Sequence, residues 1–481
     1  METVSSIADA VKKGEVSAEE IARRTLARID ERDAGLHAFL TIARDEVLAS
    51  ARAIDEKRAR GGTLGALAGV PVALKDALTT RGTRTTCASK MLEAWVPPYD
   101  ATVVARLRAA DALLPGKTNM DEFAMGSSTE NSAFGPAKNP RDTTRTPGGS
   151  SGGSAVAVAS GMTPASLGSD TGGSIRQPAA LTGCVGVKPT YGRVSRFGLV
   201  AFASSLDQVG PFATDVRGAA RVLSVIAGRD GRDSTSLAAE VPDFEDAVGK
   251  SVRGLRIGVP EEYFASGLDP EVEASVRAAI AALERDGCTV QNVHLAHTNH
   301  AVATYYVLAT AEASSNLARF DGVRYGLRVS GSEDSAKKRG ALRAMYGATR
   351  DAGFGVEVKR RIMLGTFVLS GGYYDAYYLK AQKVRTLIRR DFEAAFANVD
   401  AIVCPTSPTP AFRLGEKTSD PLAMYLSDVY TLPASLAGVP AMSVPCAPTK
   451  AGLPVGLQIV APSMKETTML SIAAAWEARA Q

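Results

Sequence analysis

The sequence predicts an α/β fold in which helices pack on a central sheet. Short apolar segments typical of buried strands recur along the 481 residues, and longer segments with helical spacing separate them. This alternation is typical of layered α/β proteins. With 45% hydrophobic and 22% charged residues, the composition is globular and allows a sizeable core. The predicted strands are 69–74, 255–259, 401–404 and 455–460, and the longer predicted helical stretches are 270–286, 356–398 and 465–480.

The N-terminal region predicts a helix that starts with its own cap. Ser17 and Glu20 form a Ser-x-x-Glu capping box, and apolar residues follow at positions 22, 26 and 29. The strand at 69–74 comes next and runs into Lys75. The pattern of 101–113 then predicts a second amphipathic helix.

The chain has no internal repeat and no linker of the Pro/Ser type. The segment 228–250 is polar and irregular, so we expect a surface excursion there, although it could equally divide two lobes. We prefer one large domain spanning 1–481, even though chains of this length often contain more than one.

Charge and cysteine content exclude several classes of protein. The net charge is only +4, so no general affinity for nucleic acids or membranes follows from it. The five cysteines form no C-x-x-C pair, which disfavours a disulfide scaffold or an all-cysteine zinc site. We see no signal peptide at the start and no apolar run that could span a bilayer. We therefore expect a soluble, cytoplasmic protein without a membrane partner.

The most unusual stretch is 147–174, which contains three Gly-Gly-Ser units. A flexible linker is one interpretation, but the apolar run 155–159 inside the stretch should be buried. Phosphate binding is another. Gly116-Lys117-Thr118 looks like the end of a P-loop, but that motif needs glycine where Asp111 stands. The remaining interpretation of this stretch is that one of its serines, placed beside glycines, is a nucleophile.

A serine nucleophile needs a base, and the four histidines do not supply an obvious one. Three of them, at 294, 297 and 300, could share a helix face as metal ligands. We favour surface positions, because no cysteine or carboxylate completes a ligand set nearby in the sequence, and we predict no metal site. A buried lysine can also lose its proton. Lys75 is the strongest candidate because it ends an apolar strand, although it could instead form a salt bridge beside Asp76.

Together these residues resemble the amidase signature family. The matching motifs are Gly-Val-Pro-Val-Ala-Leu-Lys-Asp at 69–76, Gly-Gly-Ser-Ser-Gly-Gly-Ser at 148–154, Gly-Gly-Ser-Ile-Arg at 172–176, and 183–190. The resemblance implies the amidase signature fold, a central mixed sheet covered by helices on both faces, with a signature core at about 65–210.

Three further stretches, 119–132, 312–322 and 359–366, resemble the A subunits of the glutamyl-tRNA(Gln)/aspartyl-tRNA(Asn) amidotransferases within this family. The similarity covers nearly the whole chain. One departure is Ala77, because those subunits usually carry Asn after the Lys-Asp pair. The loss of that side chain needs compensation if it steadies the lysine loop.

The resemblance implies a Ser-cisSer-Lys triad. Ser174 is the expected nucleophile, Ser150 the proton relay and Lys75 the base, with Ser151 as the adjacent rival for the relay. An oxyanion hole is expected from the backbone N–H groups of Thr171, Gly172, Gly173 and Ser174.

The implied substrate is glutamine, whose α-carboxylate and α-ammonium call for one cation and one anion in the site. By resemblance and by charge, the candidates are Arg361 and Asp428. Tyr305 or Tyr306 supplies a further hydroxyl in this hypothesis. Ordinary packing is the alternative for these residues, and we expect packing for the tyrosine cluster at 373, 374, 377 and 378.

The resemblance also implies partners. The chain is expected to form a heterotrimer with subunits B and C, and to carry no cofactor itself. ATP and Mg²⁺ are expected on a partner, which uses the ammonia to amidate Glu-tRNA(Gln), Asp-tRNA(Asn) or both, and which holds the charged tRNA. The alternatives are a stand-alone amidase acting on another small amide and a non-catalytic scaffold protein.

Overall fold

The computed structural model describes residues 2–265 and 267–480. In this part of the chain, eleven strands form one sheet, in the order β1-β3-β2-β4-β6-β5-β10-β11-β9-β7-β8. The strands are β1 (Phe39–Ile42), β2 (Val72–Lys75), β3 (Gly116–Thr118), β4 (Ala165–Asp170), β5 (Val185–Lys188), β6 (Gln208–Ala213), β7 (Arg256–Pro260), β8 (Thr289–Val293), β9 (Ala401–Pro405), β10 (Ala441–Pro445) and β11 (Gly456–Val460).

The sheet is mixed, as predicted. β2 runs parallel to β3 and β4, and β7 runs parallel to β8 and β9, whereas the remaining pairs are antiparallel. The α-helices are α1 (Val4–Lys13), α2 (Ala18–Leu36), α3 (Arg44–Ala59), α4 (Thr102–Ala109), α5 (Gly152–Ala159), α6 (Arg176–Thr182), α7 (Val216–Ile226), α8 (Pro270–Arg285), α9 (Ala301–Asn316), α10 (Glu333–Arg339), α11 (Ala341–Gly353), α12 (Val356–Val368), α13 (Lys380–Phe396), α14 (Pro421–Tyr425), α15 (Leu432–Ala437) and α16 (Glu466–Ala480).

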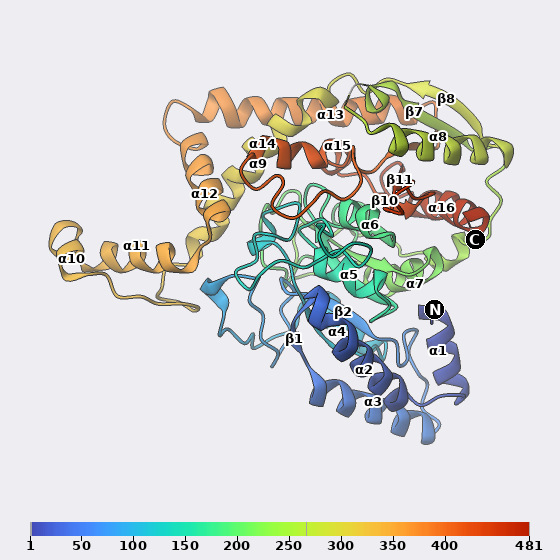
Figure 1. Cartoon of the computed structure of the whole chain (residues 1–481), viewed down its shortest axis with the longest axis horizontal. Helices are drawn as coiled ribbons and strands as arrows, with labels where there is room; N and C mark the ends of the chain where they lie inside the picture. The colour runs from blue at the N-terminus through green and yellow to red at the C-terminus, as the bar shows by residue number, and fades with distance from the viewer. Residues whose placement is uncertain (1, 266, 481) are drawn as a thin grey trace.

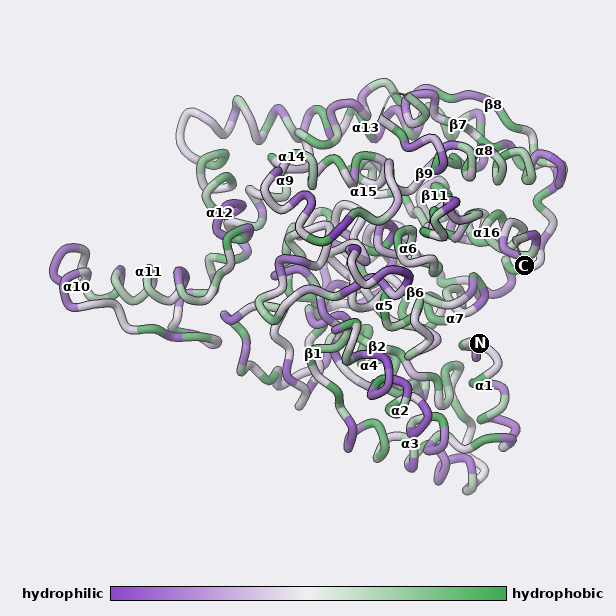
Figure 2. Tube along the Cα trace, in the orientation of Figure 1, coloured by the Kyte–Doolittle hydropathy of each residue, from purple (hydrophilic) through white to green (hydrophobic). Residues whose placement is uncertain are grey.

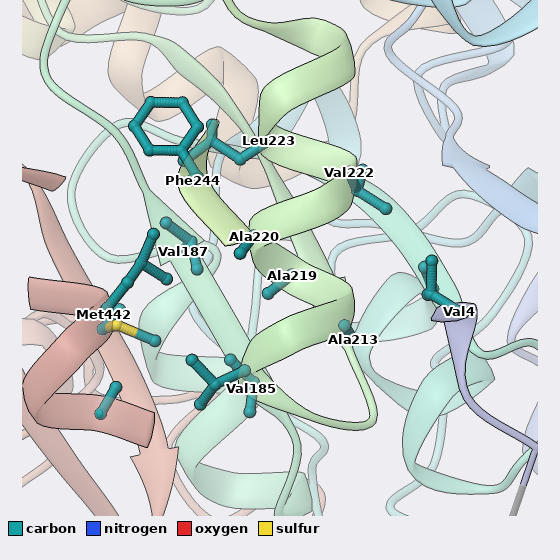
Figure 3. Close-up of a cluster of buried hydrophobic side chains, with 14 of the residues drawn as sticks. Val4, Val185, Val187, Ala213, Ala219, Ala220, Val222, Leu223, Phe244 and Met442 are labelled. Atoms are coloured by element: carbon teal, nitrogen blue, oxygen red, sulfur yellow. The ribbon is translucent and has the colours of Figure 1, made fainter. Parts of the chain in front are cut away.

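Both faces of the sheet are covered by apolar cores. Successive side chains of a strand point to opposite faces. On β9, Ala401 and Val403 belong to one hydrophobic cluster, whereas Ile402 and Cys404 belong to another. The first cluster includes buried residues of α7, which packs against β5 and β6 (Figure 3). The second includes residues of α9, α13 and α15. Figure 2 shows hydrophobic and hydrophilic residues alternating along α13, as expected for a helix with one buried face.

Most predicted elements are confirmed with small shifts. The four predicted strands correspond to β2, β7, β9 and β11, and α2 begins after Ser17, whose hydroxyl accepts the backbone N–H of Glu20. The helix predicted at 101–113 ends earlier, because α4 stops at Ala109 and Asp111 has a positive φ of 61°.

The prediction of one helical stretch over 356–398 is only partly right. α12 ends before a Gly-Gly pair in which Gly372 takes a positive φ of 86°, a conformation that glycine adopts without strain. A π-helical turn, Tyr374–Leu379, then leads into α13. The pair thus separates α12 from α13.

The polar segment 228–250 connects α7 to β7, which lies in the same sheet. It contains only a 3-10 turn, Phe244–Ala247, and Phe244 is buried against α7 (Figure 3). α10 and α11 instead extend away from the body (Figure 1). No helix in the described ranges is both long and apolar enough to cross a membrane.

Candidate active site

Three hydroxyl groups surround the amine of Lys75. Lys75 ends β2, and Ser169 lies near the end of the parallel neighbour β4, so both residues reach the same edge of the sheet. The amine lies 2.7 Å from the hydroxyl oxygen of Ser150, 2.8 Å from that of Ser151 and 3.0 Å from that of Ser169. The predicted contact between Lys75 and the Gly/Ser stretch is therefore present.

Burial favours the neutral form of this amine, which is the form that can accept a proton. Lys75 is fully buried, and burial lowers its pKa from 10.5 to about 7. The carboxylates of Asp121, Asp207 and Asp170 oppose this shift, in that order. A large fraction of the amine is therefore neutral near pH 7.

Lys75 and Asp76 do not form a salt bridge with each other in the structure. The Asp76 carboxylate accepts a hydrogen bond from the backbone N–H of Thr86 at 2.9 Å, and lies 3.5 Å from the amine of Lys117. Asp76 also accepts the N–H of Cys87 through its carbonyl. These contacts hold the loop that follows Lys75, where Ala77 is buried among apolar residues.

Ser150 and Ser151 are equally close to Lys75 but differ in their other contacts. The Ser151 hydroxyl donates to the carbonyl of Ser169 at 3.1 Å. Within the described residues, the Ser150 hydroxyl contacts Lys75 alone. The hydrogen bonds therefore leave the Ser150 hydroxyl free for a second partner. The peptide bond between Gly149 and Ser150 is cis.

Ser174 lies in the loop between β4 and α6 and is 8% exposed. The backbone N–H of Ser151 donates to its carbonyl at 3.2 Å, which joins the two serine-containing loops. No hydrogen bond joins the Ser174 hydroxyl to Ser150 in the part of the chain that the structure describes. Catalytic hydrogen bonds are often long without substrate and tighten in the complex.

The loop that contains Ser174 carries unused backbone donors. Among the described residues, the N–H groups of 171–174 donate no hydrogen bond. A Cβ atom on Gly172 would come within 2.8 Å of Tyr305 and Leu432, and one on Gly173 within 2.2 Å of the Thr431 hydroxyl. Glycine is needed at positions 172 and 173 because neighbouring side chains occupy the space that a Cβ atom would take. The free N–H groups can stabilise an oxygen anion at Ser174.

A buried ion pair anchors the same loop. Arg176 donates to both carboxylate oxygens of Asp170, at 3.0 and 2.9 Å, and also to Thr431, Ser435 and Gln458. Burial raises the pKa of Asp170, but Arg176 outweighs it and holds that pKa below 3.8. The pair thereby joins β4 to α15 and β11.

We predict that Arg176→Gln destabilises the fold by about 3–5 kcal/mol, because it leaves a buried carboxylate without its cation. The matched control is Arg256→Gln, which breaks the half-exposed pair with Asp400 and should cost less than about 1 kcal/mol. Denaturant unfolding of both variants measures the difference, and equal losses would contradict the structural role of Arg176.

The predicted cation, Arg361, lies on α12 and is only 3% exposed. Its Nε donates to Glu357 at 2.8 Å, and its guanidinium lies over the rings of Phe202, Tyr306 and Tyr425. Its two terminal nitrogens donate no hydrogen bond to the described residues. They can therefore hold a carboxylate.

The predicted anion, Asp428, is 7% exposed and lies beside the Ser174 loop. One carboxylate oxygen accepts the hydroxyl of Ser127, whereas the other is buried without a hydrogen-bond partner in the described residues. This second oxygen would lie 3.2 Å from a Cβ atom on Gly173. Burial raises the pKa of Asp428 to about 7. A cationic ligand would satisfy the free oxygen.

The two candidate tyrosines occupy different positions. Tyr305 presses on Gly172, with its hydroxyl 2.9 Å from the Cβ position. Tyr306 stacks on Tyr425 with ring centroids 3.7 Å apart, next to Arg361. Tyr305 is thus nearer to the N–H donors, and Tyr306 nearer to the guanidinium.

The remaining candidates lie elsewhere. The ring of His297 lies 2.9 Å from Asp391, and His294 lies near Glu262, so carboxylates from distant segments do approach these histidines. Across the described ranges, no group of three His, Cys, Asp or Glu residues could hold a metal ion. The tyrosine cluster packs as predicted, because the rings of Tyr373 and Tyr377 and those of Tyr374 and Tyr378 contact each other four residues apart. This packing lies at the surface, since three of the four tyrosines are more than 40% exposed.

Sequence reasoning missed several groups that support the site. Ser169 contacts Lys75, Asp207 accepts the Thr171 hydroxyl at 2.7 Å, and Gln177 accepts the N–H of Gly149 at 3.0 Å. Gln177 follows a recognised motif and could have been found there. Asp207 carries no local signal.

Comparison with known proteins places the chain in a family. The sequence model described as Amidase matches residues 20–470. The chain belongs to the amidase family. It is 58% identical over 475 residues to the A subunit of the glutamyl-tRNA(Gln) amidotransferase of Koribacter versatilis (strain Ellin345), covering 99% of this chain and 98% of the relative. The corresponding protein from Moorella thermoacetica is 59% identical, with 99% and 96% covered.

Solved structures show the same amidase fold. The crystal structure of the A subunit of the glutamyl-tRNA(Gln) amidotransferase from Thermotoga maritima is 44% identical, with a TM-score of 0.78 and coverage of 95% of this chain and 90% of that one. A bacterial aryl acylamidase of the amidase signature family is 26% identical, with a TM-score of 0.86 and coverage of 100% and 96%. The amidase fold thus accommodates different amides, so the substrate must be argued from the site.

Proposed function

We propose that this chain is the glutamine-hydrolysing A subunit of a tRNA-dependent amidotransferase. The full-length identity to subunits of that name supports this. The observation that carries the choice of substrate is a buried guanidinium, that of Arg361, together with a buried carboxylate, that of Asp428, close enough for the guanidinium to lower the pKa of the carboxylate. The guanidinium has free donors and the carboxylate has a free acceptor within the described residues, which suits the α-carboxylate and α-ammonium of glutamine.

In this proposal, Ser174 is the nucleophile and attacks the side-chain amide carbon of glutamine. Ser150 takes the proton from the Ser174 hydroxyl and passes its own to the neutral amine of Lys75. Ser150 fits the relay better than Ser151, because the Ser151 hydroxyl already donates to Ser169. The N–H groups of 171–174 receive the negative charge on the former carbonyl oxygen.

Collapse of the tetrahedral intermediate breaks the carbon–nitrogen bond. The proton held by Lys75 returns through Ser150 to the leaving nitrogen, so ammonia leaves and a γ-glutamyl ester remains on Ser174. Water, activated by the same relay, then hydrolyses the ester to glutamate. The reaction needs no cofactor on this chain.

The ammonia passes to a partner in this proposal. Subunits B and C complete a heterotrimer, and a partner carrying ATP and Mg²⁺ amidates Glu-tRNA(Gln), Asp-tRNA(Asn) or both. The charged tRNA is held mainly by the partner, in keeping with the small net charge of this chain.

Ammonia release from glutamine tests the proposal. It should be measured with the chain alone, and then with the partner subunits, ATP and each charged tRNA. Strong stimulation by the partners and by one acceptor supports the coupled reaction. Full activity of the chain alone, with preference for another amide, would indicate a stand-alone amidase instead.

We predict that Asp428→Asn raises the KM for glutamine at least about thirtyfold and lowers kcat less. The substrate ammonium then faces a neutral amide, which costs about 2 kcal/mol or more. The matched control is Asp420→Asn, an exposed cap of α14 that accepts the N–H of Ala423. An unchanged KM for Asp428→Asn would remove this residue from the substrate site.

A further inference from the structure

Asp121 is a fully buried carboxylate that the proposed chemistry does not use. It follows β3, and its two oxygens accept backbone N–H groups, from Thr129 at 2.9 Å and from Asn131 at 3.1 Å. Within the described residues it forms no ion pair. Two fixed backbone donors and no ion-pair contact are the surroundings of a carboxylate that orders a loop.

The carboxylate lies directly behind the peptide that precedes Ser150. A Cβ atom on Gly149 would come within 2.1 Å of an Asp121 carboxylate oxygen. The backbone N–H of Asp121 also donates to the carbonyl of Ser150 at 3.2 Å. Asp121 thus contacts the Ser150 segment twice, through its carboxylate at Gly149 and through its backbone N–H at the Ser150 carbonyl.

The loop that Asp121 orders, 126–131, also reaches the predicted substrate site. Ser127 in this loop donates its hydroxyl to Asp428. The Ser127 carbonyl accepts the side-chain amide N–H of Gln177 at 2.9 Å, and the oxygen of the same amide accepts the N–H of Gly149 at 3.0 Å. The Asp121 carboxylate therefore contacts both the loop that contains Ser150 and the 126–131 loop, whose Ser127 donates to Asp428.

We propose that Asp121 is a positioning residue that fixes the Ser150 loop and the 126–131 loop relative to each other. The proton relay and the site for the substrate ammonium then keep a constant relative position. This inference rests on the proposed function for its second half only. The first half concerns the relay, whatever the amide.

Asp121 also acts on Lys75 through its charge. The groups that face Lys75 are the carboxylates of Asp121, Asp207 and Asp170 and the thiol of Cys87, and the contribution of Asp121 is the largest of these. Asp121 itself faces Lys75 and Glu130. Removing its negative charge favours the neutral amine, so the pKa of Lys75 falls and activity persists to lower pH.

The test uses Asp121→Asn in the full chain purified with its partners. This variant keeps the shape and one acceptor oxygen, but removes the charge. The first readout is the pH dependence of Ser174 labelling by a fluorophosphonate, in which the serine oxygen bonds to phosphorus, fluoride leaves and the proton passes to the relay. The second is the KM and kcat for glutamine.

We expect the acid limb of the labelling profile to move down by about half to one pH unit, and the KM for glutamine to rise about tenfold. The matched control is Asp33→Asn, because Asp33 on α2 likewise accepts two backbone N–H groups, from Ala38 and Phe39. This control should lose stability without moving the acid limb. Ser127→Ala should raise KM without moving it either, and tests the second loop if Asp121→Asn does not fold.

An unchanged acid limb and KM in Asp121→Asn, or an unchanged KM in Ser127→Ala, would overturn the inference. A uniform loss of activity at every pH would also overturn it, because that result indicates a merely structural role. A wild-type enzyme that is labelled but hydrolyses no glutamine would contradict the proposed function instead, and the labelling profile would still decide the role of Asp121 at the relay.

Discussion

Ser174→Ala is expected to lower the rate of glutamine hydrolysis at least about 10⁴-fold. Ser174 is the serine that stands within the run of free N–H groups at 171–174, so we expect no neighbour to form the ester in its place. The residual rate comes from the oxyanion donors and from binding. Ammonia release measures the loss, and the KM for any residual activity should change little.

Ser160→Ala is the matched control for this variant. Ser160 caps the end of α5 in the same Gly/Ser stretch, and its hydroxyl donates to the carbonyl of Val156 at 2.6 Å. We expect nearly full activity from it. A Ser174→Ala enzyme that kept more than about one hundredth of the activity would contradict the nucleophile assignment.

Lys75→Met and Lys75→Arg are both expected to lower the rate at least about 10³-fold. Methionine removes the base, and arginine stays protonated and cannot accept the relay proton. In the proposed mechanism, the active form of Lys75 is the neutral amine, and the pKa of Lys75 is about 7. Activity should therefore fall as the pH drops below 7 and level off above it.

Lys188→Met is the control for burial alone. Lys188 is another buried lysine whose pKa burial lowers to about 7, but it donates to the carbonyls of Val439 and Pro189 away from the serines. Its loss should reduce stability and leave the acid limb of the pH profile in place. An active Lys75→Arg enzyme would contradict the role of Lys75 as base.

The sequence was most informative where function depends on neighbouring residues. Lys75, Ser150 and Ser174 stand in glycine-rich or strand-end motifs whose residue types are unusual in themselves. The residues that position these three side chains are harder to predict, because they come from segments that are distant in the sequence. Ser127 and Asp428 are 301 positions apart, and nothing local marks them as partners.

The fold shows the same division. Apolar strands of five residues, such as β9 and β11, were predicted, whereas β3 has three residues and contains a lysine. Lys117 in β3 is buried only because it meets Asp76, Leu78 and Thr85 from another loop. Short or polar strands of this kind depend on tertiary pairing, which a single sequence does not reveal.

The most direct test of the central claim is to trap the acyl-enzyme. The complex is mixed with glutamine, quenched with acid and digested with trypsin, which releases the segment between Arg145 and Gln177 as one peptide. Fragmentation by mass spectrometry should place one γ-glutamyl group on Ser174, and none in Ser174→Ala. A glutamyl group on Ser150 or Ser151, or steady turnover with no adduct in the peptide, would contradict the account.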